Sequence, residues 1–149
     1  MVFPDVNILV NAFREDTPGH QACHRWLDRF ANGDEPFALP DSVLAAFLRI
    51  VTHGQIFKPP ARFDTALAFA QELRARPNCV RLSPGPRHWD VFTRLCREGD
   101  ARGNLVADAY IAALAIESGC ELITLDRDFA RFPGLRWRPP VLSSQHPSS

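Results

Sequence analysis

The stretch that decides the fold is residues 104–128, NLVADAYIAALAIESGCELITLDRD. Its first half predicts a helix, and Asp108 is the only charge from residue 105 to residue 116 of that helix. Gly119 is expected to end the helix, since glycine tolerates the conformation that closes a helix C-terminus. Residues 121–125 then predict an apolar strand, and Asp126 follows it directly. A helix leading into such a strand is typical of a βαβ unit.

The rest of the chain alternates in the same way. Short strands are expected at residues 2–4, 37–39, 79–82 and 135–137, and helices at 17–31, from 41 or 42 to about 53, 63–73 and 89–95. Strands that alternate with helices favour right-handed crossovers. The predicted fold class is therefore α/β, with a short, mainly parallel β-sheet flanked by helices. Pro4 fits poorly inside a central strand, because proline has no N–H to donate.

Length and net charge predict the number of domains and the absence of a general attraction for nucleic acid. A chain of 149 residues predicts one domain, which we place at residues 1–138, with a flexible C-terminal tail at 139–149 that is rich in Pro, Ser and Gln. Seventeen basic residues balance seventeen acidic ones. No overall positive field therefore attracts a polyanion, and any nucleic acid must be met by a local patch.

The four cysteines and the N-terminus predict a cytoplasmic protein. No two cysteines form a CxxC pair, and reduced thiols are the default outside small secreted scaffolds. The first residues, MVFPD, lack the basic and apolar regions of a signal peptide. No stretch approaches the roughly 20 apolar residues that span a bilayer, so no membrane association is expected.

Three acidic residues stand where acids are costly. Asp5 interrupts an apolar run, Asp108 lies in the apolar helix, and Asp126 ends an apolar strand. In open α/β sheets, ligands bind at the carboxyl ends of strands, where Asp5 and Asp126 would meet and Asp108 could join them. Converging carboxylates favour a hard divalent cation such as Mg²⁺ or Mn²⁺. The alternative is three separate local roles, as turn residue, hydrogen-bond acceptor and helix cap.

Other sites are less well supported. His20 and His24 have the spacing of a zinc pair, but no second ligand pair follows. Lys58, Arg102 and Arg127 could line a crevice that accepts phosphate, or simply lie at the surface. A phosphoacceptor receiver domain would need a lysine near the last strand, and Lys58, in a loop, is the single lysine of the chain.

With these acids in place, the chain resembles the PIN-domain ribonuclease toxins of the VapC family, from type II toxin–antitoxin systems. The resemblance rests on DVNILV at residues 5–10, the helix at 104–115, and LITLDRDF at 122–129 with FPGLRW at 132–137. It implies a PIN-like fold and a Mg²⁺-dependent endoribonuclease, usually a homodimer. Such enzymes cut structured RNA (tRNA or rRNA) and are neutralised by a VapB-type antitoxin.

The resemblance also implies roles for individual residues. Asp5, Asp108 and Asp126 match the catalytic, metal-binding acids of the family. Asp128 matches a less constant fourth metal position, and Asn7 matches the polar residue that supports the first Asp. Held by these acids, the ion would activate a water for in-line attack on the phosphodiester.

The chain departs from the family at one position. VapC proteins commonly carry a Glu on the helix after the second strand, and here Ala46 stands in its place, within VLAAFLR at residues 43–49. The alternative function is therefore a catalytically weak or inactive PIN-fold module that binds RNA or protein. For an antitoxin, grooves beside Trp26, Phe47 and Phe57 are candidate contacts, unless these side chains pack in the core.

Overall fold

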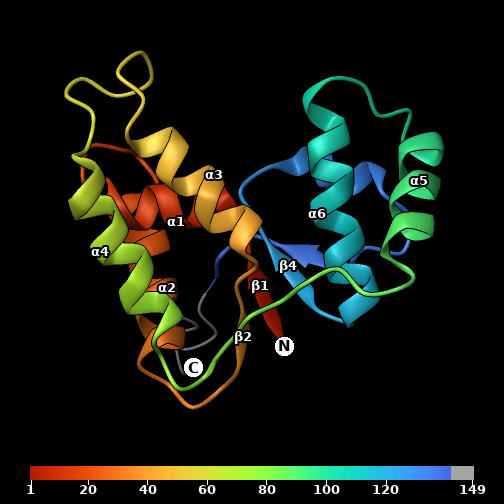
Figure 1. Ribbon diagram of the computed structural model, residues 1–149, viewed down its shortest axis with the longest axis horizontal. Helices are drawn as coiled ribbons and strands as arrows, with labels where there is room; N and C mark the ends of the chain where they lie inside the picture. Colours follow the sequence, from red (N-terminus) through yellow and green to blue (C-terminus); the bar gives the residue numbers. More distant parts are fainter. Residues whose placement is uncertain (142–149) are drawn as a thin grey trace, which may run out of the picture.

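The computed structural model describes residues 1–141; residues 142–149, which hold most of the expected tail, lie outside the described part. It confirms the α/β class, with a five-stranded parallel sheet and helices around it (Figure 1). The strands are β1 (Val2–Pro4), β2 (Phe37–Ala38), β3 (Cys79–Val80), β4 (Glu121–Ile123) and β5 (Trp137–Arg138). The helices are α1 (Val6–Phe13), α2 (His20–Ala31), α3 (Asp41–Val51), α4 (Phe63–Arg74), α5 (His88–Glu98) and α6 (Asn104–Ser118), followed by the 3₁₀ helix η1 (Arg127–Arg131). The boundary at residue 138 and the flexibility of the tail stay predictions.

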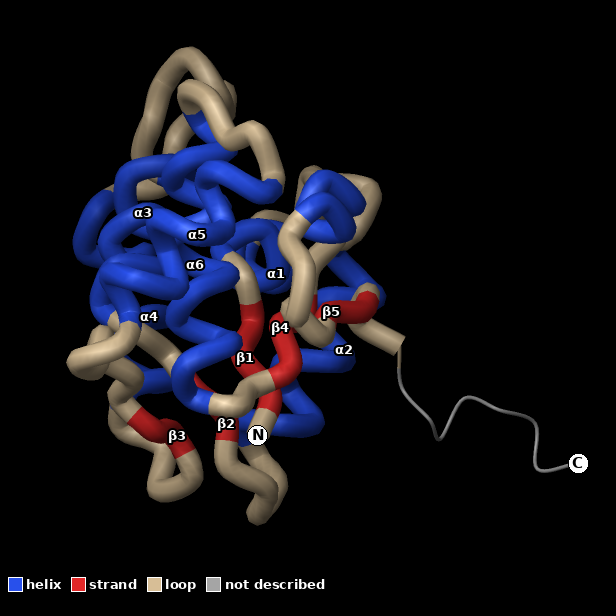
Figure 2. Tube along the Cα trace, turned by 90° about the vertical axis from the view of Figure 1, so that its right-hand side faces the viewer, coloured by secondary structure: helices blue, strands red, loops and turns tan. Residues whose placement is uncertain are grey.

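The order of the strands brings the ends of β1 and β4 together. The sheet runs β3-β2-β1-β4-β5, so the chain leaves β1 toward β2 on one side and returns to β4 on the other (Figure 2). The backbone N–H of Asp5 donates to the Ile123 carbonyl at 2.9 Å, which extends the pairing one residue past β1. This reversal of direction is the position where open α/β sheets bind ligands.

Pro4 lies in a central strand and is accommodated on the side that faces β2. Backbone N–H groups along a strand point alternately to its two neighbours, and that of Asp5 points to β4. The nitrogen of Pro4 therefore faces β2, where the pairing of β1 is limited to Val2 opposite Phe37. Proline has no N–H to continue this pairing, so the β1–β2 ladder stops before it while the bonds to β4 are kept.

Apolar side chains fill the space between the sheet and its helices. Figure 1 shows α1 to α4 gathered on one side of the central strands, and α5 with α6 on the other. Trp26 and Phe47 are fully buried, which confirms core packing, the other role considered for these side chains. Phe57 is partly buried against the same core. Among residues 1–141, no helix is long and apolar enough to cross a membrane.

Helix α2 begins later than predicted, and α3 and α6 begin without a capping side chain. Helix α2 starts at His20 rather than residue 17, because residues 17–19 form a turn in which the His20 N–H donates to the Thr17 carbonyl. Helix α3 has Pro40 at its N-cap, so neither acidic nor hydroxyl side chain caps it. Asn104, a residue type that favours the N-cap and is expected there, is instead the first residue of α6, and the cap is Gly103 at a φ of 57°. Gly119 ends α6 in the left-handed region, as expected.

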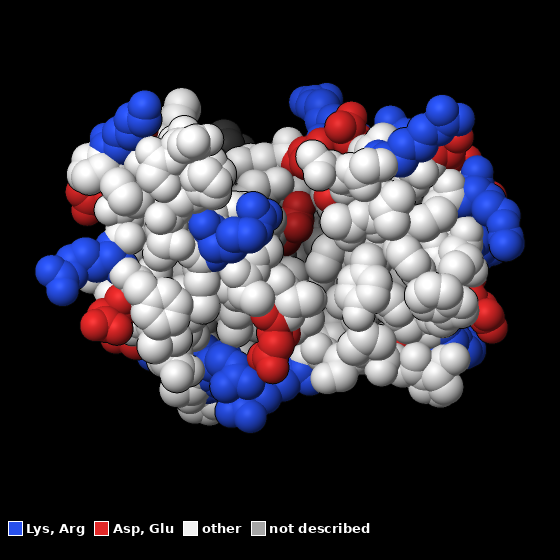
Figure 3. Space-filling model, turned by 45° about the horizontal axis from the view of Figure 1, so that its top comes forward, with Lys and Arg blue, Asp and Glu red and all other residues white. Residues whose placement is uncertain are grey.

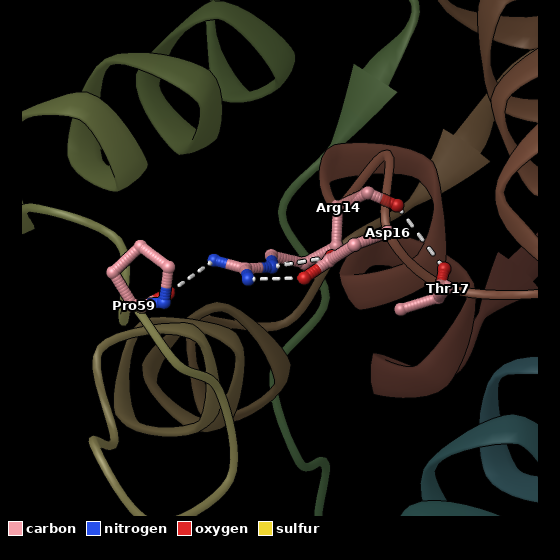
Figure 4. Close-up of polar contacts among 4 residues, drawn as sticks. All are labelled: Arg14, Asp16, Thr17 and Pro59. Carbon is pink, nitrogen blue, oxygen red and sulfur yellow. Dashed lines mark hydrogen bonds and ion pairs between the residues drawn. The ribbon is translucent and has the colours of Figure 1, made fainter.

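An arginine joins two loops on the α1 side of the sheet. The Arg14 guanidinium donates to both carboxylate oxygens of Asp16, at 2.9 and 2.6 Å, and to the Pro59 carbonyl at 3.1 Å (Figure 4). It also lies 4.2 Å from the centre of the Phe57 ring. These contacts fix the end of α1 against the long α3–α4 loop, on the opposite end of α1 from Asp5.

Candidate active site

Asp5 is held firmly at the junction of β1 and α1. It is the N-cap of α1, and its Oδ1 accepts a hydrogen bond from the Val6 N–H at 2.8 Å. The residue is only 6% exposed, and burial raises the pKa of its carboxyl above the usual value. Oδ1 accepts no other hydrogen bond from the described residues, so this oxygen keeps acceptor capacity for a ligand.

Thr124 connects the two strand ends. Its fully buried hydroxyl donates to Asp5 Oδ2 at 2.9 Å and accepts from the Asp126 backbone N–H at 3.1 Å. Asn7 adds a second link, because its Nδ2 donates to Asp5 Oδ2 at 3.3 Å and to Thr124 Oγ at 3.1 Å. Its Oδ1 accepts from the Leu125 N–H at 3.2 Å. Asn7 thus contacts the first Asp directly, and Thr124 is a site residue that the sequence analysis missed.

Asp126 and Asp128 lie on the segment that follows β4. Asp126 caps η1, with its Oδ1 accepting the Asp128 N–H at 2.9 Å. Asp126 is half-buried, whereas Asp128 is exposed. The hydrogen bond orients Asp126 next to Asp5, and Asp128 stands further out toward solvent.

Asp108 approaches the same place from helix α6. Burial raises the pKa of its carboxyl to about 6, and repulsion from Asp5, Asp126 and Asp128 adds to the rise. Arg131 opposes this rise with its positive charge. Asp108 therefore lies close enough to the other three acids for their charges to hinder its ionisation.

Asp5 and Asp108 open into one cavity of about 480 Å³ between α3 and α6, which we call the acidic pocket. Its other lining residues are Val6, Ser42, Val43, Ala46, Arg49, Ile50, Asn104, Ala107, Tyr110 and Ile111. Figure 3 shows this side of the molecule hollowed between two lobes, with acidic atoms recessed in the hollow and a basic side chain at its edge. Ala46 lines the same cavity as the two acids, so a Glu at this position would add a carboxylate to it. Asp41 points elsewhere and pairs with Arg74 at 3.1 Å.

The donor set of the acidic pocket fits a hard divalent cation. Its charged oxygens are all carboxylates, and their mutual repulsion is relieved when a cation binds among them. Among residues 1–141, no three Asp, Glu, His or Cys side chains are gathered closely enough to enclose an ion. Mg²⁺ is commonly held by one or two carboxylates, with waters and substrate phosphates completing its shell. Asp5 and Asp108 can supply that number.

The remaining expected residues lie outside this pocket. The rings of His20 and His24 are 5.3 Å apart, but His20 Nδ1 contacts the Asn11 carbonyl and the described residues add no further ligand. Lys58, Arg102 and Arg127 do not line it, and the cation that does is Arg49. Its position three residues after Ala46, near one turn along the same helix, is the signal that could have identified it.

Comparison with known proteins agrees with this architecture. The sequence profile of the PIN domain matches residues 2–135. Ribonuclease VapC25 from Mycobacterium tuberculosis is 44% identical over 142 residues, which cover 95% of this chain and 100% of that protein. The range matched by the profile spans Asp5, Asp108, Asp126 and Asp128.

Solved structures share the fold. The chain resembles a crystal structure of VapBC2 from Rickettsia felis bound to a DNA fragment from their promoter, with a TM-score of 0.67 and 20% identity over 93% of this chain and 98% of that one. It also resembles VapC20 from Mycobacterium tuberculosis, a sarcin–ricin loop cleaving toxin, with a TM-score of 0.64 and 17% identity over 91% of this chain and 99% of that one. By its sequence profile, its relatives and its fold, the chain belongs to the PIN-domain family, among the VapC ribonucleases of toxin–antitoxin systems.

Proposed function

We propose that this protein is a Mg²⁺-dependent endoribonuclease toxin that cleaves structured RNA. The observation that carries the proposal is the pairing of Asp5 and Asp108 in one pocket, with the Asp108 pKa raised to about 6 by burial and by the acids around it. Membership in a family of ribonucleases supports cleavage of RNA as the reaction at this carboxylate site. Asp5, Asp108 and Asp126 are the proposed catalytic, metal-binding acids; Asp5 and Asp108 share the pocket, and Asp126 and Asp128 stand outside its lining as outer contributors. Mn²⁺ is a substitute ion.

Different residues of the pocket would bind the ion and the RNA. A bound divalent ion would make a water more acidic and offset charge on the phosphate. Asp5 is oriented for the ion by Thr124 and Asn7, so its carboxylate does not have to reorganise. Arg49, on the wall of the same pocket, is placed to bind a phosphate oxygen of the RNA.

The substrate class follows from shape and charge. The net charge of zero gives no general attraction for RNA, so local geometry has to select it. Folded RNA presents exposed loops whose phosphates can enter a cleft between two helices. The likeness to VapC20, a toxin that cleaves the sarcin–ricin loop, supports ribosomal RNA as one candidate. Transfer RNA is the other.

A non-catalytic role is less well supported. Ala46 removes one carboxylate from the pocket, which motivated that alternative. Two carboxylates and the phosphate of the substrate are nevertheless enough to hold Mg²⁺. Relatives with 44% identity are ribonucleases by name, which favours catalysis.

The same family membership suggests the partners. The likeness to a VapBC complex supports a VapB-type antitoxin that silences the site, and we propose a homodimer as the active form. The cysteines of the described chain form no disulfide, which agrees with a reducing, cytoplasmic location.

The test is a cleavage assay on total tRNA and on ribosomal RNA. We expect discrete fragments with Mg²⁺ or Mn²⁺, none with EDTA, and none from D108N, whose side chain cannot carry the charge. A gel-shift assay beside it detects RNA binding. If the native protein shifts RNA but cuts neither RNA under any divalent metal, it is the non-catalytic module and the proposal is wrong.

A further inference from the structure

A second cavity adjoins the acidic pocket. It has a volume of about 360 Å³ and is lined by residues 40–42, Arg74, residues 81–84 and Tyr110; we call it the arginine pocket. Ser42 and Tyr110 line both cavities, so the two are neighbours along one groove. Figure 1 shows why: the segment after β3 passes from the β2 side of the sheet to α5, across the lower half of α6.

The cations of the arginine pocket differ in their partners. Arg74 donates to Asp41 at 3.1 Å, which holds its guanidinium at the rim and partly neutralises it. Arg81 is exposed and makes no ion pair or side-chain hydrogen bond with the described residues. Its charge is therefore available to a ligand, and a planar guanidinium matches the geometry of a phosphate.

Tyr110 is a fixed aromatic wall between the two cavities. Its ring packs edge-on against His88, with centroids 4.4 Å apart, and against Phe92 at 5.6 Å. His88 is itself buried and its Nε2 contacts the Tyr110 carbonyl at 3.0 Å, so the backbone there is fixed as well. The Tyr110 hydroxyl makes no hydrogen bond with residues 1–141. A rigid ring beside a cleft is a surface on which a nucleobase can stack.

We propose that the arginine pocket is a subsite for the nucleotide next to the scissile phosphate. Arg81 binds the phosphate of that nucleotide, and Tyr110 contacts its base. This inference rests on the proposed ribonuclease function, since it places the strand in the groove that leads away from Asp5 and Asp108. The carboxylates attract the metal ion and repel the RNA phosphates. The arginines attract the adjoining phosphate and so position the RNA strand.

The test compares R81Q with R25Q. Arg25 is an exposed arginine on α2 that lines neither cavity, so it controls for the loss of one charge. The first measurement is steady-state cleavage of total tRNA. We expect R81Q to raise KM roughly three- to tenfold with kcat nearly unchanged, and Y110L to raise KM as well, while R25Q matches the native protein.

The second measurement needs no catalysis. A fluorescent single-stranded RNA of about 12 nucleotides is titrated in EDTA at several salt concentrations. R81Q should weaken binding and lower the slope of log K against log salt by about 0.7, as expected for one lost phosphate contact. R25Q should leave the slope unchanged.

The two arms separate the possible failures. Native protein that cuts no RNA contradicts the proposed function, and the binding arm then still decides the subsite. Native protein that cuts RNA, with R81Q and R25Q equal in KM and in salt slope, contradicts the subsite alone. Absence of RNA binding by the native protein also overturns it.

Discussion

The hydroxyl of Thr124 lies 2.9 Å from Oδ2 of Asp5, although 119 positions separate the two residues in the chain. The same hydroxyl oxygen receives the N–H of Asp126. One buried threonine therefore sets the orientation of the first acid and the backbone of the third. The relationship exists because β1 and β4 are neighbours, and it makes the carboxylate of Asp5 part of the fold before any ion arrives.

Removal of this hydroxyl should damage both stability and activity. T124V keeps the shape of the side chain but removes one hydrogen bond from the Asp5 carboxylate and leaves the Asp126 N–H without its partner. We expect a loss of about 1–3 kcal/mol of unfolding free energy, measured by urea titration, because buried polar groups are left unsatisfied. Cleavage should fall at least tenfold in the folded protein. T124S, which keeps the hydroxyl, should restore most of both; equal behaviour of the two variants would mean that the hydroxyl has no role.

The pocket position of Ala46 leads to a gain-of-function prediction. A46E adds a carboxylate to the cavity that contains Asp5 and Asp108. It should tighten Mg²⁺ or Mn²⁺ binding and should destabilise the metal-free protein, since like charges repel. A45E is the matched control, because Ala45 is exposed and does not line the pocket. Calorimetric titration with Mn²⁺ checks this, and equal affinities for the two variants would show that α3 does not face the ion.

The raised pKa of Asp108 predicts how stability depends on pH. The folded protein holds this proton more tightly than the unfolded chain, with a pKa near 6 against the ordinary 3.8. Its contribution to stability is therefore fully present below the unfolded value and is lost as pH rises through about 6. In EDTA, native protein should lose stability from pH 4 to pH 7 relative to D108N in urea titrations. A constant difference between the two across this range would contradict the assignment.

Metal binding should show the opposite dependence on pH. The ion requires the ionised carboxylate, so its affinity should fall as pH drops below the Asp108 pKa of about 6. Mn²⁺ titrations at several pH values measure this. In D128N the affinity should change little at any pH, because the Asp128 side chain is exposed and at the edge of the site. A larger loss in D128N than in D108N would reverse the proposed order of importance.

Much of the architecture was predictable because it follows from local pattern. Apolar strands that end in an acid, and an apolar helix with a single charge, placed Asp5, Asp126 and Asp108 near one edge of a parallel sheet. Pairing of β1 with β4 then follows from the position of the sheet's reversal. Gly119 ended its helix as expected, since a left-handed residue is needed there.

The remainder depends on contacts that no local pattern encodes. Threonine is a common residue in strands, so Thr124 carries no signal in the sequence. Its role depends on hydrogen bonds with Asp5 and Asn7, which the fold brings from the other end of the chain. The sequence leaves Trp26 and Phe47 open between groove contacts and core packing, and tertiary packing buries both fully. The link between the two cavities at Tyr110 likewise needs the path of the segment after β3, which the sequence does not specify.

The most direct test of a shared cation is a thermal melt of native protein and of D108N over a range of Mg²⁺ and Mn²⁺ concentrations. An ion that binds only the folded state raises the melting temperature with concentration. We expect this rise for the native protein and none for D108N, whose fold in EDTA should be at least as stable as the native one because repulsion among the acids is relieved. If the two proteins melt identically at every metal concentration, Asp108 does not hold the ion and the account of this site is wrong.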